Sequence, residues 1–149
     1  MKALIKEETR VLVQEVPLPT LEHPDDVLIR VHRAGICRTD IAVAKGFLPV
    51  HSPLILGHEF SGRVEATGSG VIRLSQGQKV TVMPIIPCYQ CFLCQQKEFS
   101  LCLNSQMLGV TCSGAFAEWI CVPQSLVYPL PEEMSFLLGA YTEPVASSL

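Results

Sequence analysis

The chain has 149 residues, of which 48% are hydrophobic and 17% are charged, and its formal net charge is −3. This composition predicts one domain that can bury a hydrophobic core, and it disfavours nucleic acids and anionic membranes as partners because lysine and arginine are not clustered. No apolar run could span a bilayer, and the N-terminus does not have a signal-peptide pattern. We therefore expect a cytoplasmic protein whose seven cysteines are metal ligands and reduced thiols.

Short β-strands separated by turn residues make up most of the expected elements. Strand patterns occur at residues 1–6, 9–16, 25–34, 60–67, 78–83, 115–122 and 126–130. The first two strands can pair as a hairpin. Many short strands with turn signals between them predict a mainly β chain, folded as a mostly antiparallel barrel or sandwich.

Short helices are expected at two places. Residues 38–45 predict a helix that ends at Gly46, and residues 134–149 predict a helical region with a further helical start at Pro144. The sequence 68–70, Gly-Ser-Gly, is similar to part of a dinucleotide-binding fingerprint. However, Arg73 takes the place of the third glycine and no helix pattern follows, so we interpret this segment as a hairpin turn.

Candidate metal ligands occur in two turns that are flanked by glycines. Cys37 follows Gly35, and His58 and Glu59 follow Gly57. Sulfur, imidazole nitrogen and carboxylate oxygen are donors that zinc accepts in tetrahedral sites. Taken alone, a single cysteine and a single histidine are as often buried packing residues as ligands.

Four further cysteines share the spacing C-x2-C-x2-C-x7-C; they are Cys88, Cys91, Cys94 and Cys102. Four thiolates on one short excursion can enclose a single ion without an open position, as a structural zinc site requires. A pair of disulfides and an iron–sulfur cluster are the alternatives. Cysteines separated by two residues rarely reach relaxed disulfide geometry with each other, and the four-cysteine spacing favours zinc.

Together these motifs resemble the zinc-dependent alcohol dehydrogenases of the medium-chain dehydrogenase/reductase superfamily. The matching segments are 37–40, 57–62, the four cysteines and 114–119, and Glu143-Pro144 is most similar to the polyol and threonine dehydrogenase branch. The resemblance implies a GroES-like β-barrel catalytic domain over residues 1–149, with a zinc lobe at about 84–104. Residues 134–149 would begin the connection to a nucleotide-binding Rossmann domain that is missing from this chain.

The resemblance also implies two zinc ions. The four cysteines would hold a structural ion, and Cys37 and His58 would hold a catalytic ion with one further ligand. That ligand is either Glu59 or Glu143. The alternative for Glu59 is a carboxylate directly behind the metal, and the alternative for Glu143 is an acid at a helix N-terminus.

Three residues that follow Cys37 have implied roles in the family. Thr39 would be the hydroxyl nearest the substrate oxygen, and Asp40 would hydrogen-bond the zinc-ligating His58. Arg38 would contact the cofactor pyrophosphate, although a solvated surface arginine is an equal alternative. A histidine often continues the proton relay three residues after the threonine, but this chain has Ala42 there, which leaves the proton exit undefined.

The implied function is the catalytic part of an NAD- or NADP-dependent dehydrogenase of small alcohols, polyols or the corresponding carbonyl compounds. We expect the isolated chain to bind zinc but not to turn over alcohol, because no Gly-rich strand–helix turn is present. If the complete protein is a homo-oligomer, we expect its contacts in the missing domain. The alternative is a zinc-scaffolded binding or assembly module without catalysis. A thiol redox protein is less favoured, because no thioredoxin-like setting surrounds the cysteine pairs.

Overall fold

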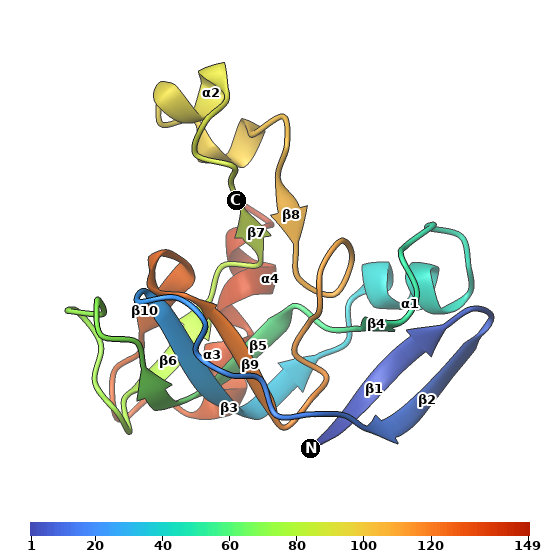
Figure 1. The fold of residues 1–149 in the computed structure, drawn as a ribbon, viewed down its shortest axis with the longest axis horizontal. Helices are drawn as coiled ribbons and strands as arrows, with labels where there is room; N and C mark the ends of the chain where they lie inside the picture. The colour runs from blue at the N-terminus through green and yellow to red at the C-terminus, as the bar shows by residue number, and fades with distance from the viewer.

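The structure, a computed structural model, describes residues 1–149. The strands are β1 (Lys2–Glu7), β2 (Arg10–Glu15), β3 (Asp26–Gly35), β4 (Leu54–Ile55), β5 (Glu59–Thr67), β6 (Lys79–Val82), β7 (Ile85–Ile86), β8 (Gln106–Met107), β9 (Trp119–Pro123) and β10 (Val127–Pro129). The helices are α1 (Arg38–Ala44), α2 (Phe92–Gln95), α3 (Phe136–Ala140) and α4 (Thr142–Ala146), with 3-10 turns at Phe99–Leu101 and Gln124–Leu126. Strands therefore predominate, which confirms the expected fold class (Figure 1).

A five-stranded antiparallel sheet in the order β10-β6-β5-β3-β9 curls around the main core. The long strand β3 pairs with β5 on one side and with β9 on the other. Its register with β5 shifts between Val31 and Arg33, and irregularities of this kind bend and twist a strand. Beyond the shift the two strands stay paired to their ends, so that Gly35 lies opposite Glu59.

The expected N-terminal hairpin is confirmed. β1 pairs with β2 along its whole length and with the short strand β4 on its other edge, which makes a second sheet in the order β2-β1-β4. A bridge from Ala3 to Ala117 joins β1 to the segment before β9, and the Leu4 N–H donates to the Phe116 carbonyl at 2.7 Å. The second sheet therefore extends the wall of the barrel.

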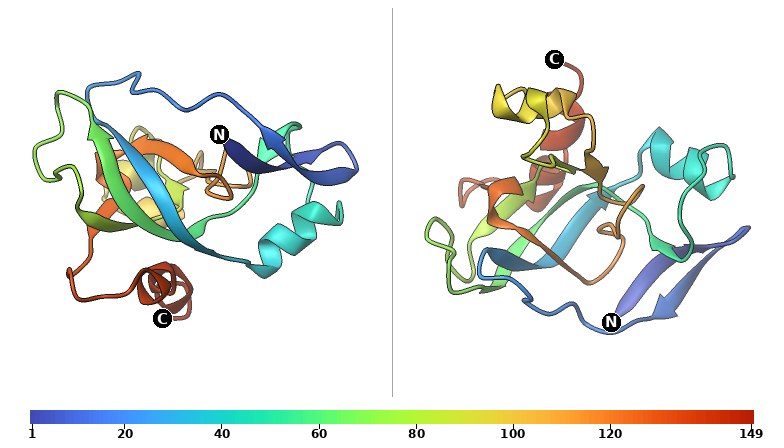
Figure 2. Two further views of the ribbon diagram at one scale, coloured as in Figure 1. Left: turned by 90° about the horizontal axis from the view of Figure 1, so that it is seen from below. Right: turned by 45° about the horizontal axis from the view of Figure 1, so that its top comes forward.

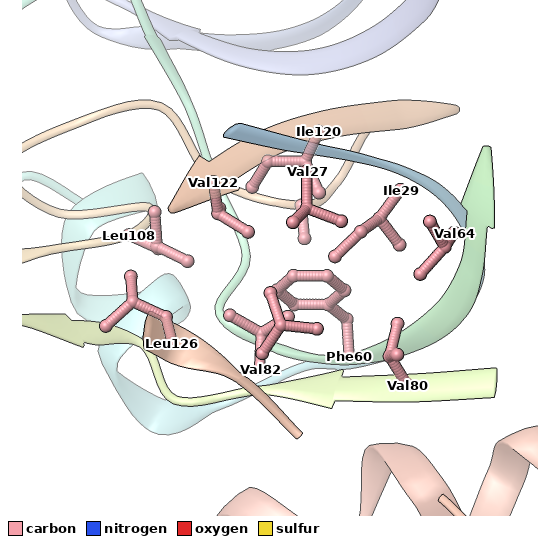
Figure 3. Packing of buried hydrophobic residues seen from close by; sticks show 12 residues of the cluster. Val27, Ile29, Phe60, Val64, Val80, Val82, Leu108, Ile120, Val122 and Leu126 are labelled. Atoms are coloured by element: carbon pink, nitrogen blue, oxygen red, sulfur yellow. The ribbon is translucent and has the colours of Figure 1, made fainter. Parts of the chain in front are cut away.

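The main core is built from the inward-facing residues of the large sheet. The Phe60 ring, which is fully buried, lies among Val27 and Ile29 of β3 and Val80 and Val82 of β6 (Figure 3). The alternation that predicted these strands is therefore the alternation of core and outer positions.

The last two helices lie on the outer face of the curled sheet, away from this core (Figure 2). Phe136 anchors α3 there, because its ring stacks on His32 with centroids 4.1 Å apart and lies under the cationic groups of Arg63 and Lys79. The buried Ser61 hydroxyl also donates to the Phe136 carbonyl at 2.6 Å. None of the four helices has the length and apolar character that crossing a membrane would require.

The cysteine-rich segment projects from the barrel as a separate lobe (Figure 1). Its stem is the pair β7–β8, in which Ile85 lies opposite Met107 and Ile86 lies opposite Gln106. Between the two stem strands the chain forms only α2 and a 3-10 turn. Regular secondary structure therefore contributes little to the lobe, and the cysteines must supply much of its order.

Three local expectations differ from the structure in their details. Residues 68–70 do form a turn between the antiparallel strands β5 and β6, and the Val71 N–H donates to the Gly68 carbonyl at 3.2 Å. The connection is longer than a simple turn, because the Gly68 and Gly70 N–H groups donate to the Asp26 and Pro24 carbonyls at 2.8 and 2.7 Å and β6 begins only at Lys79. The strand expected from residue 115 begins at Trp119, since residues 114–116 bond instead to residues 55–57. Helix α4 begins at Thr142, so Pro144 is its third residue, still within the first turn where an N–H has no helical partner.

Candidate metal centres

The ends of β3 and β5 bring three candidate ligands together. Because Gly35 at the end of β3 pairs with Glu59 at the start of β5, Cys37 lies beside His58 and Glu59. The ligand atoms of Cys37, His58 and Glu59 all lie within 4.8 Å of one another. A tetrahedral zinc ion has bonds of about 2.0–2.3 Å, so its ligand atoms lie roughly 3.3–3.8 Å apart. The three side chains thus need only small adjustments to share one ion.

Glycine at position 35 makes room for the carboxylate. A Cβ atom on Gly35 would lie 2.5 Å from Glu59 Oε2, closer than two unbonded atoms can approach. The carboxylate therefore folds over the end of β3, toward the turn that carries Cys37. Gly35 therefore leaves the space in which Glu59 lies beside Cys37 and His58.

Asp40 supports the centre from behind. Its carboxylate is 3% exposed and accepts the Cys37 N–H at 2.8 Å and the Gly57 N–H at 3.1 Å, so it fixes the turns that carry both Cys37 and His58. Asp40 Oδ1 is also 3.4 Å from His58 Nδ1, although the two groups are not aligned as a hydrogen bond. The expected proximity of Asp40 and His58 is therefore present, and the imidazole is left with an unpaired buried nitrogen.

The charges around His58 favour a cation. Burial of the imidazole lowers its pKa, but Asp40 and Cys37 raise it more strongly, and the balance raises the pKa of His58 to about 9. A pocket that raises the pKa of a buried imidazole stabilises positive charge at that place. The donor set and this electrostatic environment both fit a zinc ion.

Thr39 and Arg38 follow Cys37 on the first turn of α1. The Thr39 hydroxyl is 3.6 Å from Cys37 Sγ, beside the candidate ligands, whereas Arg38 is exposed. Ala42 is half-buried one turn further along the same helix and carries no group that could pass on a proton.

Glu143 lies near the centre but outside the group of three. Burial raises the pKa of the Glu143 carboxyl, with His58 opposing and Glu59 adding to this effect through their charges. Glu143 also lines a cleft of about 530 Å³ together with residues 81–85 and 128–130. The structure therefore brings Glu59, rather than Glu143, within 4.8 Å of Cys37 and His58.

The four cysteines of the lobe form a second cluster, whose sulfur atoms all lie within 4.8 Å of one another. The Cys88–Cys94 and Cys91–Cys102 sulfur pairs are each 4.0 Å apart, about twice the length of a disulfide bond. Four thiolates around zinc lie roughly 3.8 Å apart when each Zn–S bond is about 2.3 Å. The spacing therefore fits one ion, whereas the irons of a cluster would hold their thiolates further apart.

Backbone N–H groups prepare the lobe for anionic sulfur. The Cys88 N–H donates to Cys102 Sγ at 3.2 Å, and the Cys91 N–H donates to Cys88 Sγ at 3.4 Å. Hydrogen bonds from the backbone at Cys94 and Leu103 lower the pKa of Cys91 to about 6, whereas burial and the neighbouring thiols raise the pKa of Cys94 to about 12. Thiolates are the form in which cysteine binds zinc.

Two supporting features were missed by sequence reasoning. Lys6 is 5% exposed and its ammonium donates to the Ala44 carbonyl at 3.1 Å, at the C-terminal end of α1, where a cation is favourable. Gly109 and Gly114 pack directly against the backbone of Gly57. No sequence signal indicates either contact, because both join segments that are far apart in the chain.

A β-barrel that brings a thiol, an imidazole and a carboxylate together and carries a four-cysteine lobe is the architecture of a zinc-dependent dehydrogenase catalytic domain. The family described as alcohol dehydrogenase GroES-like domain matches residues 23–132. The chain belongs to this family, which confirms the resemblance drawn from the motifs.

Individual relatives agree with this assignment. L-threonine 3-dehydrogenase from Rhizobium etli is 36% identical over 157 residues, an alignment that covers 100% of this chain and 45% of that protein. Galactitol-1-phosphate dehydrogenase from Escherichia coli has a TM-score of 0.92 at 34% identity, over 97% of this chain and 42% of that one. A protein described as a zinc-binding dehydrogenase from Sinorhizobium meliloti, bound to NADP, has a TM-score of 0.92 at 36% identity, over 97% of this chain and 42% of that one. The chain thus spans less than half the length of these relatives.

Proposed function

We propose that this chain is the catalytic domain of a zinc-dependent, NAD- or NADP-linked alcohol or polyol dehydrogenase. The observation that carries the proposal is the meeting of a thiol, an imidazole and a carboxylate at the junction of β3 and β5, within 4.8 Å of one another. Family membership supports the same conclusion. The four-cysteine lobe would hold a second zinc ion whose role is structural, since four thiolates leave no open coordination position.

Cys37, His58 and Glu59 are the proposed ligands of the catalytic ion, and the distances among them support Glu59 over Glu143 as the third ligand. Zinc held by these residues would act as a Lewis acid toward an alcohol or carbonyl oxygen, and the nicotinamide would carry the hydride. Asp40 keeps the Cys37 and His58 turns in place through its two backbone hydrogen bonds. Glu143 stands beside the centre, where its charge adds to that of Glu59.

Thr39 is the proposed proton carrier. Its hydroxyl, 3.6 Å from Cys37 Sγ, can accept the proton of a substrate hydroxyl and donate its own onward. Because Ala42 offers no further acceptor, the proton would pass to water, to the cofactor ribose or to another group. Arg38, exposed on the same turn, is the proposed contact for the cofactor pyrophosphate.

Metal content tests the proposal. We expect two zinc ions per chain, one removed readily by a chelator and one resistant. Cys37→Ser should abolish the readily removed ion alone, and Cys94→Ser, as the matched change in the lobe, should abolish the resistant ion. A wild-type chain with one resistant zinc ion that Cys37→Ser does not affect would contradict a catalytic metal centre.

Turnover is a separate test. The described elements contain no strand, glycine-rich turn and helix in the order that binds a dinucleotide. We therefore expect the purified 149-residue chain to reduce no NAD or NADP with secondary alcohols. Steady turnover by this chain would contradict that part of the proposal.

The second candidate is a zinc-scaffolded binding or assembly module, and Ala42 at the relay position is the observation that favours it. In such a module the four-cysteine ion would remain, while Cys37 would be free. Rapid alkylation of Cys37 in the zinc-loaded chain would select this candidate, and protection of Cys37 by bound zinc would exclude it.

A further inference from the structure

Gly57, the residue before His58, meets two glycines from a distant part of the chain, Gly109 and Gly114. A Cβ atom on Gly109 would lie 2.7 Å from both the backbone nitrogen and the backbone oxygen of Gly57. A Cβ atom on Gly114 would overlap the Gly57 oxygen and lie 2.7 Å from Gly109 Cα. The contact is therefore backbone on backbone, and none of these positions has room for a side chain.

Phe116 closes the remaining side of Gly57. A Cβ atom on Gly57 would fall within the Phe116 ring, and Gly57 itself has a positive φ of 93°, which favours glycine. Residues 114–116 run beside residues 55–57 like an added strand, with Gly114 N–H donating to Ile55 O and Phe116 N–H donating to Leu56 O, each at 2.8 Å.

The polar groups of Gly57 are also held. Its carbonyl accepts the Ala115 N–H at 2.9 Å, and its N–H donates to Asp40 Oδ1 at 3.1 Å. The residue that precedes His58 is thus fixed by hydrogen bonds at both polar atoms and by packing against both glycines and the phenyl ring. A shift of this backbone would turn the imidazole away from Cys37.

The segment that carries Gly109 and Gly114 follows the four-cysteine lobe in the chain. The chain leaves the lobe through β8, Leu108 N–H then donates to Pro84 O at 3.0 Å, and Gly109 follows. In Figure 1 this segment runs from β8 down beside β4. Gly109 therefore connects the base of the lobe to the backbone of Gly57, the residue before His58.

We propose that Gly109, Gly114 and Phe116 are positioning residues for the Cys37–His58–Glu59 centre. They hold the Gly57 backbone, and through it they set the direction of the His58 imidazole. This inference rests on the proposed metal-binding function of that centre. A positioning role differs from general support of the fold in its effect on metal binding. Loss of positioning weakens the Cys37–His58–Glu59 centre and leaves the four-cysteine centre intact.

The chain contains a matched control. Gly109 and Gly77 have similar positive φ values, 72° and 85°, so alanine meets similar backbone strain at both. A Cβ atom on Gly77 would have nothing within 4 Å, whereas one on Gly109 would press on Gly57. The comparison of Gly109→Ala with Gly77→Ala therefore isolates the contact behind His58. Phe116→Leu leaves all glycines unchanged and serves as a milder second variant.

Cobalt(II) titration of the metal-free 149-residue chain separates the two centres, because four thiolates give far stronger charge-transfer absorption than one. We expect wild type and Gly77→Ala to bind two cobalt ions alike. Gly109→Ala and Phe116→Leu should bind the four-thiolate ion normally and the other ion at least about tenfold more weakly, as for other groups that orient metal ligands.

The outcomes are distinct. If Gly109→Ala does not fold, Phe116→Leu decides the question. Normal binding of the second cobalt ion by the variants that fold would overturn the inference, and so would an equal loss at both centres. Binding of a single cobalt ion by the wild-type chain would instead overturn the proposed function, and the inference with it.

Discussion

Replacement of Asp40 by asparagine removes a charge at the back of the candidate metal centre while preserving the shape of the side chain. The two carboxylate oxygens accept one backbone N–H each, from Cys37 and from Gly57. Asparagine has only one acceptor oxygen, so its amide NH₂ must face one of these N–H groups and leave it unpaired. Because Asp40 is 3% exposed, water cannot easily replace the lost acceptor.

The expected cost follows from these contacts. A buried N–H without an acceptor costs about 1–3 kcal/mol, and the exchange of the other charge-assisted bond for a neutral one costs about 1 kcal/mol. We therefore expect Asp40→Asn to lower the free energy of unfolding of the metal-free chain by about 2–4 kcal/mol. The same change should weaken zinc binding at the Cys37–His58–Glu59 centre about 10- to 100-fold.

Urea unfolding of the metal-free chain and zinc titration against a chromophoric chelator measure the two effects. Asp25→Asn is the matched control, because Asp25 is exposed, and an exposed substitution of this kind should change stability by no more than about 0.5 kcal/mol. The four-cysteine ion should bind equally in both variants. The reasoning is refuted if Asp40→Asn matches Asp25→Asn in both stability and zinc affinity.

Three other predictions concern separate parts of the molecule. Phe60→Ala should destabilise the chain by about 3–5 kcal/mol in urea unfolding, because the ring is fully buried at the centre of the core; a loss below about 1 kcal/mol would contradict the packing. Lys6→Met should cost about 1–3 kcal/mol in the same assay, since the Ala44 carbonyl loses its donor, and unchanged stability would count against that contact. Burial, followed by the charge of Asp26, raises the pKa of Cys121 to about 11, so the thiol is protonated at pH 8. Its alkylation, followed by mass spectrometry, should accelerate about tenfold per pH unit up to that pKa; labelling at pH 8 as fast as a free thiol would show that the pKa is not raised.

The lobe and the barrel could be predicted from local patterns. The spacing from Cys88 to Cys102 is typical of four-cysteine zinc sites, so the cluster could be predicted from one short segment. Alternation likewise predicted a strand at residues 25–34, on which Val27 and Ile29 share a face because they are two residues apart, and both lie in the core. These features depend on neighbours in sequence, which is why a single sequence contains them.

The centre at Cys37 depends on long-range pairing that no local pattern contains. Nothing in the sequence specifies that Gly35 lies opposite Glu59, and it is this register that places Glu59, rather than Glu143, among the close donors. The turn at residues 68–70 is present as expected, but the bonds from Gly68 and Gly70 to the Asp26 and Pro24 carbonyls are long-range contacts that no local pattern contains. The glycine contact behind His58 is visible only once the chain has folded.

Anomalous scattering from a crystal of the zinc-loaded chain, collected on both sides of the zinc absorption edge, tests the central claim most directly. Our account predicts two peaks, one inside the tetrahedron of lobe sulfurs and one bonded to Cys37 Sγ, a His58 ring nitrogen and a Glu59 carboxylate oxygen. A single peak in the lobe, with the Cys37 sulfur and the His58 ring too far apart to share an ion, would contradict it.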